Sequence, residues 1–487
     1  MDNRLNPYDR FWLVLMFVIA AAIRLCTLAR RIEFDESVLI YIARQPLATG
    51  FSLILNRLGG GQTHLFGVIL HFLLALSSNT IVVRSAMLCF ELAGLYVAYL
   101  VARRLFNNAV ALYTVAVVAC AEPYIYHSTE LKVYSLWLFL SMLSVYFFIR
   151  ILSAPSGRWY AGWAVTTVAG LYAHFFGILL LMAEIVVWLA VFRRLRLQLS
   201  VFLLSGACMA IALIPLKLFL YDRCLPYPYV AEYYFSSPAY WPDVYNMFVF
   251  YCGHRVLLAC VVVIILAGIF SHARINTKRM TPEDAALKLF AVLGFVVPVA
   301  AIFLLHPWRM SFFREERYLL SCFVFFFMLF SFSLMRLPLN IRKWLVPVFL
   351  SLLMVNGLRY GVKIGRMAPL APIKPVASYL ASHREPQDKI AMRNVLNFMQ
   401  IFNELHEPYT ILTDADEINN IYLLKTFLFD QEKMYMSTAQ LKNIKRLWCV
   451  VLQGTPPLPW FDDDPRIVLK ETKIFANAEI RLYEINL

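Results

Sequence analysis

Residues 134–152 read YSLWLFLSMLSVYFFIRIL, a run of 19 residues with one charge, at Arg150. A helix rises about 1.5 Å per residue, so such a run crosses the roughly 30 Å hydrocarbon core of a bilayer. Comparable runs recur along the first three quarters of the chain. They predict about eleven transmembrane helices, at residues 11–29, 80–102, 109–123, 134–152, 160–173, 175–191, 199–220, 256–270, 286–305, 318–335 and 344–358.

The composition agrees with a polytopic α-helical membrane protein. The 487 residues are 61% hydrophobic and 16% charged, with a mean hydropathy of +0.64, whereas soluble chains carry about 25% charged residues. Residues 361–487 hold 15 basic and 15 acidic side chains, so the net charge of +14 lies in the membrane part. It is spread over loops and forms no basic, aromatic-rich patch on a soluble segment, which argues against nucleic-acid binding.

Basic clusters occupy alternate loops, which sets the expected orientation. The clusters are Arg103 and Arg104; Arg150 and Arg158; Arg193, Arg194 and Arg196; Arg274, Lys278 and Arg279; and Arg336, Arg342 and Lys343. By the positive-inside rule these loops and the N-terminus are cytoplasmic. The long loops 30–79, 123–133, 221–255 and 306–317 then face outward, and the first should hold interfacial helices. We expect a multi-pass protein of a bacterial inner membrane.

A second domain follows the membrane part. We expect residues 1–360 to form the transmembrane domain and residues 361–487 a small extracytoplasmic α/β domain, because apolar alternation at 389–392, 409–412, 446–452 and 474–483 is interleaved with helical patterns. Cys224 and Cys252 share an outward loop, where a disulfide is an open alternative to two free thiols.

Two acidic residues, Asp35 and Glu36, stand a few residues beyond the first apolar run. A carboxylate at the outer surface can accept a proton from a hydroxyl group or hold a metal ion. The structural alternative is a solvated pair, or a cap for a helix beginning near Ser37.

Two further segments concentrate polar residues at the outer surface. In the first, residues 127–134, Glu130, Lys132 and Tyr134 alternate, so an extended lead into the next helix would align them. Lys132 at headgroup depth suits a lipid phosphate, or is a snorkelling anchor. In the second, Arg309, Arg314 and Arg317 are set against Glu315 and Glu316, indicating either an anionic ligand or an internal salt-bridge network.

Isolated polar residues have simpler interpretations. His174 lies between two spans and is read as a hydrogen-bonded structural histidine. His64 and His71 are seven residues apart on one helical face, which permits metal binding. Arg24 is expected to snorkel, and Arg84 to be satisfied within the helix bundle or the interface.

The ordered set of motifs resembles the GT-C membrane glycosyltransferases, specifically bacterial relatives of protein O-mannosyltransferase and of the aminoarabinose transferase acting on lipid A. Asp35-Glu36 matches the family's acidic pair after the first span. Residues 62–71 resemble QPPLYYLLLH without its prolines, and 126–136 resemble YYSQEARMYAL with Lys132 in place of arginine. Residues 83–86, 172–177 and 317–320 are similar to RLPSA, YTHYFG and RYLL.

The resemblance implies an enzyme with a polyprenyl-phosphate-linked sugar donor and an acceptor that is a lipid, glycan or protein. Asp35 would be the general base in an inverting displacement, with Glu36 orienting it or holding a metal. Lys132, Arg317, Tyr318 and Arg314 would bind the donor phosphate, and Glu130, Tyr134, His64 and His174 would shape the site. No cofactor is required; a divalent cation, Mg²⁺ or Mn²⁺, is left open.

Three other functions compete. A lipid or sugar transporter would place polar residues and broken helices at mid-membrane. A polysaccharide polymerase or ligase would take diphosphate-linked donors, which the Arg309–Arg317 cluster would suit. A receptor or scaffold built on the outer α/β domain would tolerate Asp35→Asn.

Overall fold

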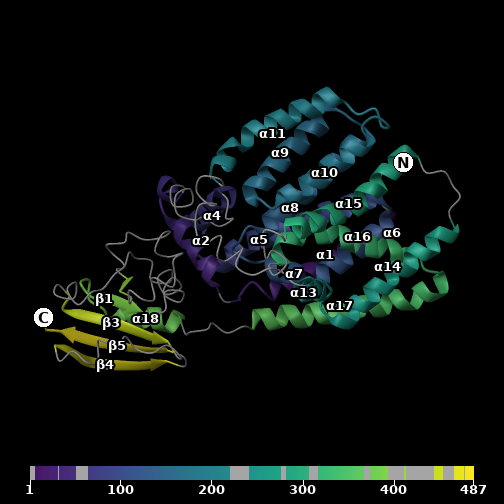
Figure 1. Cartoon of the computed structure of the whole chain (residues 1–487). Coiled ribbons are helices and arrows are strands. Elements are labelled where there is room, and N and C mark those ends of the chain that lie inside the picture. Colours follow the sequence, from purple (N-terminus) through teal and green to yellow (C-terminus); the bar gives the residue numbers. More distant parts are fainter. Residues whose placement is uncertain are drawn as a thin grey trace. The chain divides into compact units, whose positions relative to one another are not determined.

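The computed structural model describes residues 6–30, 32–50, 64–219, 241–275, 281–305, 316–366, 373–392, 411–412, 444–452, 466–475 and 478–486. The helices of the first part are α1 (Pro7–Leu25), α2 (Phe34–Arg44), α4 (His64–Leu76), α5 (Thr80–Leu105), α6 (Asn108–Cys120), α7 (Glu122–His127), α8 (Tyr134–Ser153), α9 (Gly157–Ala173), α10 (Gly177–Val191) and α11 (Leu199–Phe219) (Figure 1). They are followed by α13 (Trp241–Cys252), α14 (Arg255–Ile275), α15 (Pro282–Leu305), the 3₁₀ turn η4 (Glu316–Leu319), α16 (Leu320–Arg336), α17 (Leu339–Gly365) and α18 (Ile373–His383).

The chain divides into two compact units. The first comprises Met1–Ala29, Gly60–Ile69 and Leu76–Arg366, and the second Arg30–Gly59, Leu70–Ala75 and Met367–Leu487. The predicted division near residue 360 differs from this one in assigning α2 to the membrane part. The predicted division stays a prediction.

Within the described residues, six helices are long and apolar enough to cross a bilayer: Thr80–Leu105, Tyr134–Ser153, Leu199–Leu216, Pro282–Leu304, Arg317–Arg336 and Leu339–Gly365. The pair Pro242–Cys252 and Arg255–Gly268, bent by 89°, would be a seventh span if counted as one. The polytopic helical fold is therefore confirmed, while the count of eleven stays a prediction.

Small residues let the helices of the first unit approach closely. α5 and α8 pack along each other, and a Cβ added to Gly94 of α5 would lie 3.2 Å from the backbone nitrogen of Phe139. α14 meets α16 at Gly268, where an added Cβ would lie 2.6 Å from the Cβ of Ser333. Such contacts are typical of transmembrane bundles, in which packing replaces the hydrophobic effect as the force between helices.

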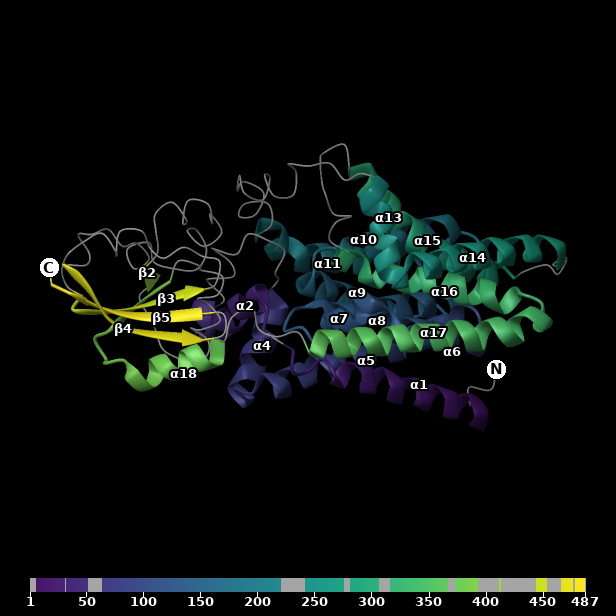
Figure 2. The ribbon, with the colours of Figure 1, turned by 90° about the horizontal axis from the view of Figure 1, so that it is seen from below.

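The C-terminal part of the second unit contains a five-stranded sheet, shown with α18 in Figure 2. Its order is β2-β1-β3-β5-β4; β1 pairs in parallel with β2 and β3, and β5 is antiparallel to β3 and β4. The bounds are β1 (Lys389–Met392), β2 (Ile411–Leu412), β3 (Arg446–Leu452), β4 (Ile467–Phe475) and β5 (Ala478–Ile485). Val376 and Leu380 of α18 pack on Trp448 in one face of the sheet.

One predicted strand is wrong. The strand expected at 474–483 is divided between the end of β4 and most of β5. Both strands of an antiparallel pair carry alternating apolar residues, so the alternation alone does not show where the chain reverses.

Candidate active site

The segment between α7 and α8 is a series of turns and not the extended lead that the alternating residues suggested. Its hydroxyl groups bind the backbone, which explains the difference. Ser128 Oγ donates to the carbonyl of Ile125 (2.8 Å), and Ser135 Oγ lies 3.1 Å and 3.0 Å from the carbonyls of His127 and Ser128. Serine hydroxyl groups that bond nearby carbonyls in this way stabilise turns.

Glu130 links the side chains of His127 and Lys132 in this segment. Its Oε2 lies 2.5 Å from His127 Nδ1, and its Oε1 lies 3.2 Å from Lys132 Nζ. The side chain of Glu130 is fully buried, and those of His127 and Lys132 are each 5% exposed. A buried charge of this kind is tolerated because its partners replace the lost hydration.

Arg317 and Tyr318 come from η4, nearly two hundred residues further along the chain, and lie among the aromatic rings of the same unit. The Arg317 Cζ is 6.0 Å from the Tyr134 ring centre and 5.5 Å from that of Tyr318. Tyr318 stacks on Phe176 at 4.3 Å and 7°. The His174 ring lies 5.5 Å from Tyr318 and 5.9 Å from Tyr134. The fold thus gathers four predicted site residues from three separate segments.

His174 has the structural character expected of it. It ends α9 as the C-cap, and its Nδ1 accepts the backbone N–H of Phe176 at 3.3 Å. Burial and, second, the nearby Arg317 guanidinium lower the pKa of His174 from 6.5 to about 3. The imidazole is therefore neutral at physiological pH.

Asp35 and Glu36 belong to the second unit, in the first turn of α2. Glu36 forms a capping box with Glu33: its Oε2 accepts the Glu33 N–H at 2.8 Å, while its Oε1 lies 3.7 Å from an Arg30 guanidinium nitrogen. Both carboxylate oxygens therefore stabilise the start of the helix. Asp35 is half-buried.

The remaining predicted residues are distributed as follows. Arg314 lies outside the described residues, as do Arg309 and Cys224; Cys252 is a buried free thiol at the end of α13. His64 begins α4, and on the same helix His71 Nδ1 is 2.7 Å from the Ala43 carbonyl oxygen. Over the described ranges no group of three or more His, Cys, Asp or Glu side chains could hold a metal ion.

The expectation that Arg24 snorkels is wrong. It does not snorkel: it is fully buried, donates to the Ala119 carbonyl at 2.8 Å, and pairs with Glu91 at 3.3 Å. The bundle supplies partners for the guanidinium, so the side chain has no need to reach the interface. Arg84 is likewise buried and donates to the Leu28 carbonyl at 3.1 Å, as expected.

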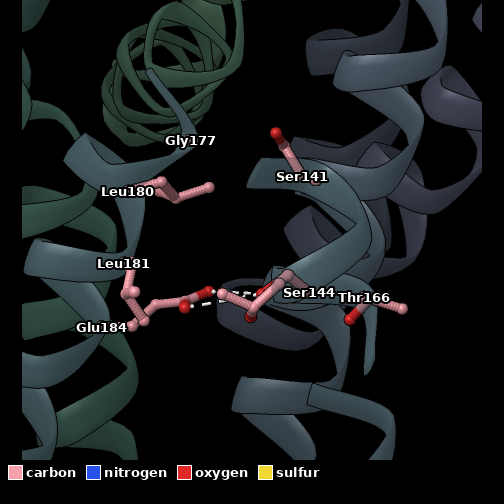
Figure 3. Close-up of a pocket in the computed structure, with 9 residues that line it drawn as sticks. Ser141, Ser144, Thr166, Gly177, Leu180, Leu181 and Glu184 are labelled. Carbon is pink, nitrogen blue, oxygen red and sulfur yellow. Dashed lines mark hydrogen bonds between the residues drawn. The ribbon is translucent and has the colours of Figure 1, made fainter. Parts of the chain in front are cut away.

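Another buried carboxyl group, that of Glu184, was missed by the sequence analysis. Figure 3 shows Glu184 of α10 and Ser144 of α8 pointing toward each other. Glu184 accepts hydrogen bonds from Trp163 Nε1 (2.7 Å) and Ser144 Oγ (3.2 Å) beside a small cavity, with about 20 Å³ for the centre of a water molecule. That space holds about one water. The sequence did carry a signal for it, because a glutamate inside the apolar run 175–191 must find polar partners within the helix bundle.

The chain is similar to known proteins in both sequence and structure. A sequence model described as "Dolichyl-phosphate-mannose-protein mannosyltransferase" matches residues 63–219, which include Lys132 and His174. The structure of ArnT from Cupriavidus metallidurans bound to undecaprenyl phosphate superposes with a TM-score of 0.63 at 15% identity, covering 97% of this chain and 98% of that one. The chain has the GT-C fold.

Two further structures share this GT-C fold. ArnT from C. metallidurans in the apo state matches with a TM-score of 0.62 at 14% identity, covering 97% of this chain and 98% of that one. The oligosaccharyltransferase of Archaeoglobus fulgidus in the apo form matches with 0.52 at 9%, covering 92% and 70%. A comparison with curated protein sequences finds no match. The resemblance to GT-C membrane glycosyltransferases of the ArnT and protein mannosyltransferase type is confirmed.

Proposed function

We propose that this GT-C protein transfers a sugar from a polyprenyl-phosphate donor to an acceptor hydroxyl group at the outer face of a bacterial inner membrane. The observation that carries the proposal lies in the first unit: Lys132 pairs with Glu130 at 3.2 Å, and Tyr134, two positions after Lys132, has its ring centre 6.0 Å from the Arg317 Cζ. Lysine and arginine side chains are well suited to binding phosphate oxygens, so these two residues suit an anionic ligand.

The fold match supports a lipid-linked phosphate as that ligand. The ArnT structure with this fold holds undecaprenyl phosphate, which is what a polyprenyl-phosphate sugar leaves behind once its sugar is transferred. In the proposed reaction the acceptor oxygen attacks the anomeric carbon, and the bond from that carbon to the phosphate oxygen breaks. Its electron pair goes to the phosphate, where Lys132 and Arg317 stabilise the added negative charge.

Asp35 is proposed to receive the proton of the acceptor hydroxyl group. Its support is the resemblance, together with its place in the first turn of α2. A single displacement inverts the configuration at the anomeric carbon and needs no second carboxylate as a nucleophile. A general base of this kind contributes about 10²–10⁴-fold.

The transport alternative receives less support from the buried charges of the bundle. Arg24 pairs with Glu91, and Glu184 accepts from Trp163 and Ser144. Groups bonded in this way hold helices together, whereas an ion pathway needs polar groups that can exchange partners. The diphosphate-linked alternative rests on the Arg309–Arg317 cluster, of which Arg309 and Arg314 lie outside the described residues.

The test is release of polyprenyl phosphate by the purified protein, supplied with a panel of polyprenyl-phosphate sugars, candidate acceptors, and Mg²⁺, Mn²⁺ or chelator. Asp35→Asn and Lys132→Ala should each abolish release. Lys343→Ala is the matched control, because Lys343 is an exposed lysine of the α17 start, 5.8 Å from the Trp344 ring centre. Failure of the wild type with every donor would favour a transport or diphosphate-linked function.

A further inference from the structure

Basic side chains gather at the end of the first unit that lies away from the candidate site. They surround the two loops that join α8 to α9 and α10 to α11, and they are Arg150, Arg158, Arg193, Arg194 and Arg196. The 20-residue helix α8 begins two positions after Lys132, so its last turn, with Arg150, lies about 25 Å from that lysine along the helix axis. Helices α9, α10 and α11 lie side by side (Figure 1), and Trp163 of α9 stacks on Phe202 near the start of α11. The two loops therefore emerge together, and we call their arginines the basic face.

The arginines of the basic face do not pair with carboxylates of the described residues. Acidic side chains are scarce in this part of the chain. Between Glu130 and Asp222 the sequence has a single one, Glu184, which is hydrogen-bonded within the bundle. At the same end of the bundle Glu283 is engaged by Arg104 at 2.7 Å. The positive charge of the basic face is therefore available to an anion.

Trp159 holds two of these arginines close together. The Cζ atoms of Arg150 and Arg158 lie 4.7 Å and 4.6 Å from the centre of its ring. Cation–π attraction accounts for both positions but neutralises neither charge. Two like charges gathered at one ring repel each other, and an anion between them would remove that repulsion. Arg158 is exposed, and Arg150 and Trp159 are half-buried, so a ligand at the surface of the bundle can reach them.

Arg196 occupies a position that usually belongs to glycine. Beyond α10 the Leu197 N–H bonds the Phe192 carbonyl at 2.9 Å, and the Arg196 N–H bonds the Arg193 carbonyl at 3.4 Å. This Schellman pattern needs a left-handed residue, and Arg196 has φ 50°, the one positive φ at a non-glycine residue within the described ranges. An exposed arginine kept at a strained position agrees with a use for its charge.

We propose that the basic face binds the head group of an anionic phospholipid from the membrane around the protein. Guanidinium groups suit phosphate oxygens, and tryptophan favours the level of the lipid head groups. Basic clusters at the ends of transmembrane helices attract anionic lipids in this way. The adjoining surface of α11 exposes Leu199 and Leu203, 46% and 60%, which acyl chains can contact. A lipid uses both the charged and the apolar surface, whereas free phosphate would use only the first.

The test uses the purified full-length protein in a neutral detergent. The ligands are phosphatidylglycerol, phosphatidylcholine and inorganic phosphate, and the rise of the thermal unfolding midpoint with ligand concentration gives an apparent dissociation constant. Arg150→Gln/Arg158→Gln removes two charges from the basic face, and Arg150→Lys/Arg158→Lys keeps them. Arg359→Gln/Arg366→Gln is the matched control, because it removes two exposed arginines near the end of α17, away from the basic face.

We expect the wild type to bind phosphatidylglycerol more tightly than phosphatidylcholine and to show no saturable response to inorganic phosphate. The glutamine pair in the basic face should weaken phosphatidylglycerol binding by about 10- to 30-fold, the combined value of two basic side chains at an anionic surface. The lysine pair should lose no more than about 3-fold, and the control pair about 2-fold. If the first glutamine pair does not fold, the same substitutions at Arg193 and Arg194 should weaken binding comparably.

Three results would overturn the inference. They are an unchanged affinity for phosphatidylglycerol in the glutamine pairs of the basic face, an equal affinity of the wild type for phosphatidylcholine, and binding of inorganic phosphate as tight as that of the lipid. The inference does not depend on the proposed transferase activity, because the basic face and Lys132 lie at opposite ends of α8.

Discussion

The carboxylate of Glu130 lies 3.2 Å from the ammonium group of Lys132, with both side chains buried. The two residues are separated by one position, so the turn between α7 and α8, and not a helix face, brings them together. The position of the lysine charge therefore depends on a neighbour that itself carries the opposite charge. This dependence gives a first prediction.

Glu130→Gln should reduce the catalytic efficiency by about 10- to 100-fold, because the Lys132 charge loses the partner that positions it. In the double variant Glu130→Gln/Lys132→Met, the loss of catalytic efficiency, expressed as a free energy, should be smaller than the sum of the losses in the two single variants, since the two groups act together. The measurement is kcat/KM in the release assay for the four proteins. Strict additivity would show that the pair is not coupled.

The stack between Tyr318 and Phe176 should position Tyr318 for the donor. Phe176→Ala removes a ring 4.3 Å away, and aromatic pairs contribute about 0.5–1.5 kcal/mol beyond their buried area. We expect the KM for the donor to rise about 3- to 10-fold. Phe176→Leu, which keeps most of the apolar volume, is the control. Its KM for the donor should lie between those of the wild type and the alanine variant.

Glu184 should matter for stability through its hydrogen bonds. Glu184→Leu leaves Trp163 Nε1 without its acceptor and removes a partner of Ser144, at about 1–3 kcal/mol for each buried polar group. Thermal unfolding in detergent should show a clear drop in midpoint. Glu184→Gln retains an oxygen that can accept the hydrogen bond from Trp163, so its unfolding midpoint should lie much closer to that of the wild type. Equal midpoints for the two variants would contradict this role.

His174 should make stability fall at acid pH. Its pKa is lowered from 6.5 to about 3 in the folded protein, so below pH 6.5 the unfolded state binds a proton that the folded state excludes. The contribution is full above pH 6.5 and is lost as the pH falls toward 3. At pH 5 the loss amounts to about 2 kcal/mol.

The matching variant is His174→Gln, which does not titrate. Its unfolding midpoint should change less between pH 7.5 and pH 5 than that of the wild type. Parallel shifts in both proteins would mean that His174 makes no pH-dependent contribution.

Much of the local architecture follows from the sequence. The run 134–152 is a helix almost residue for residue, because a long apolar segment in a bilayer must satisfy its own backbone. The acidic pair Asp35-Glu36 lies in the first turn of a helix, but that helix begins at Phe34 with Glu33 as its N-cap, and not near Ser37 as the capping alternative expected. These features depend on interactions within a few residues, which composition and spacing record directly.

The order of motifs also identified the GT-C fold, but it could not supply the contacts that form the candidate site. Lys132, His174 and Arg317 lie in three different segments, and the contact between His127 and Glu130 depends on the turns between α7 and α8, which the residue spacing did not predict. Arg24 shows the same limit, since its partner Glu91 is 67 residues away.

The sequence by itself thus determined that the chain is a polytopic helical membrane protein and which residues are capable of chemistry. Only the tertiary structure decided where the local turns and helix caps lie and which of those residues are neighbours. The physical reason is that hydrogen bonding and charge pairing act over a few ångströms in space, whereas the sequence records distance only along the chain.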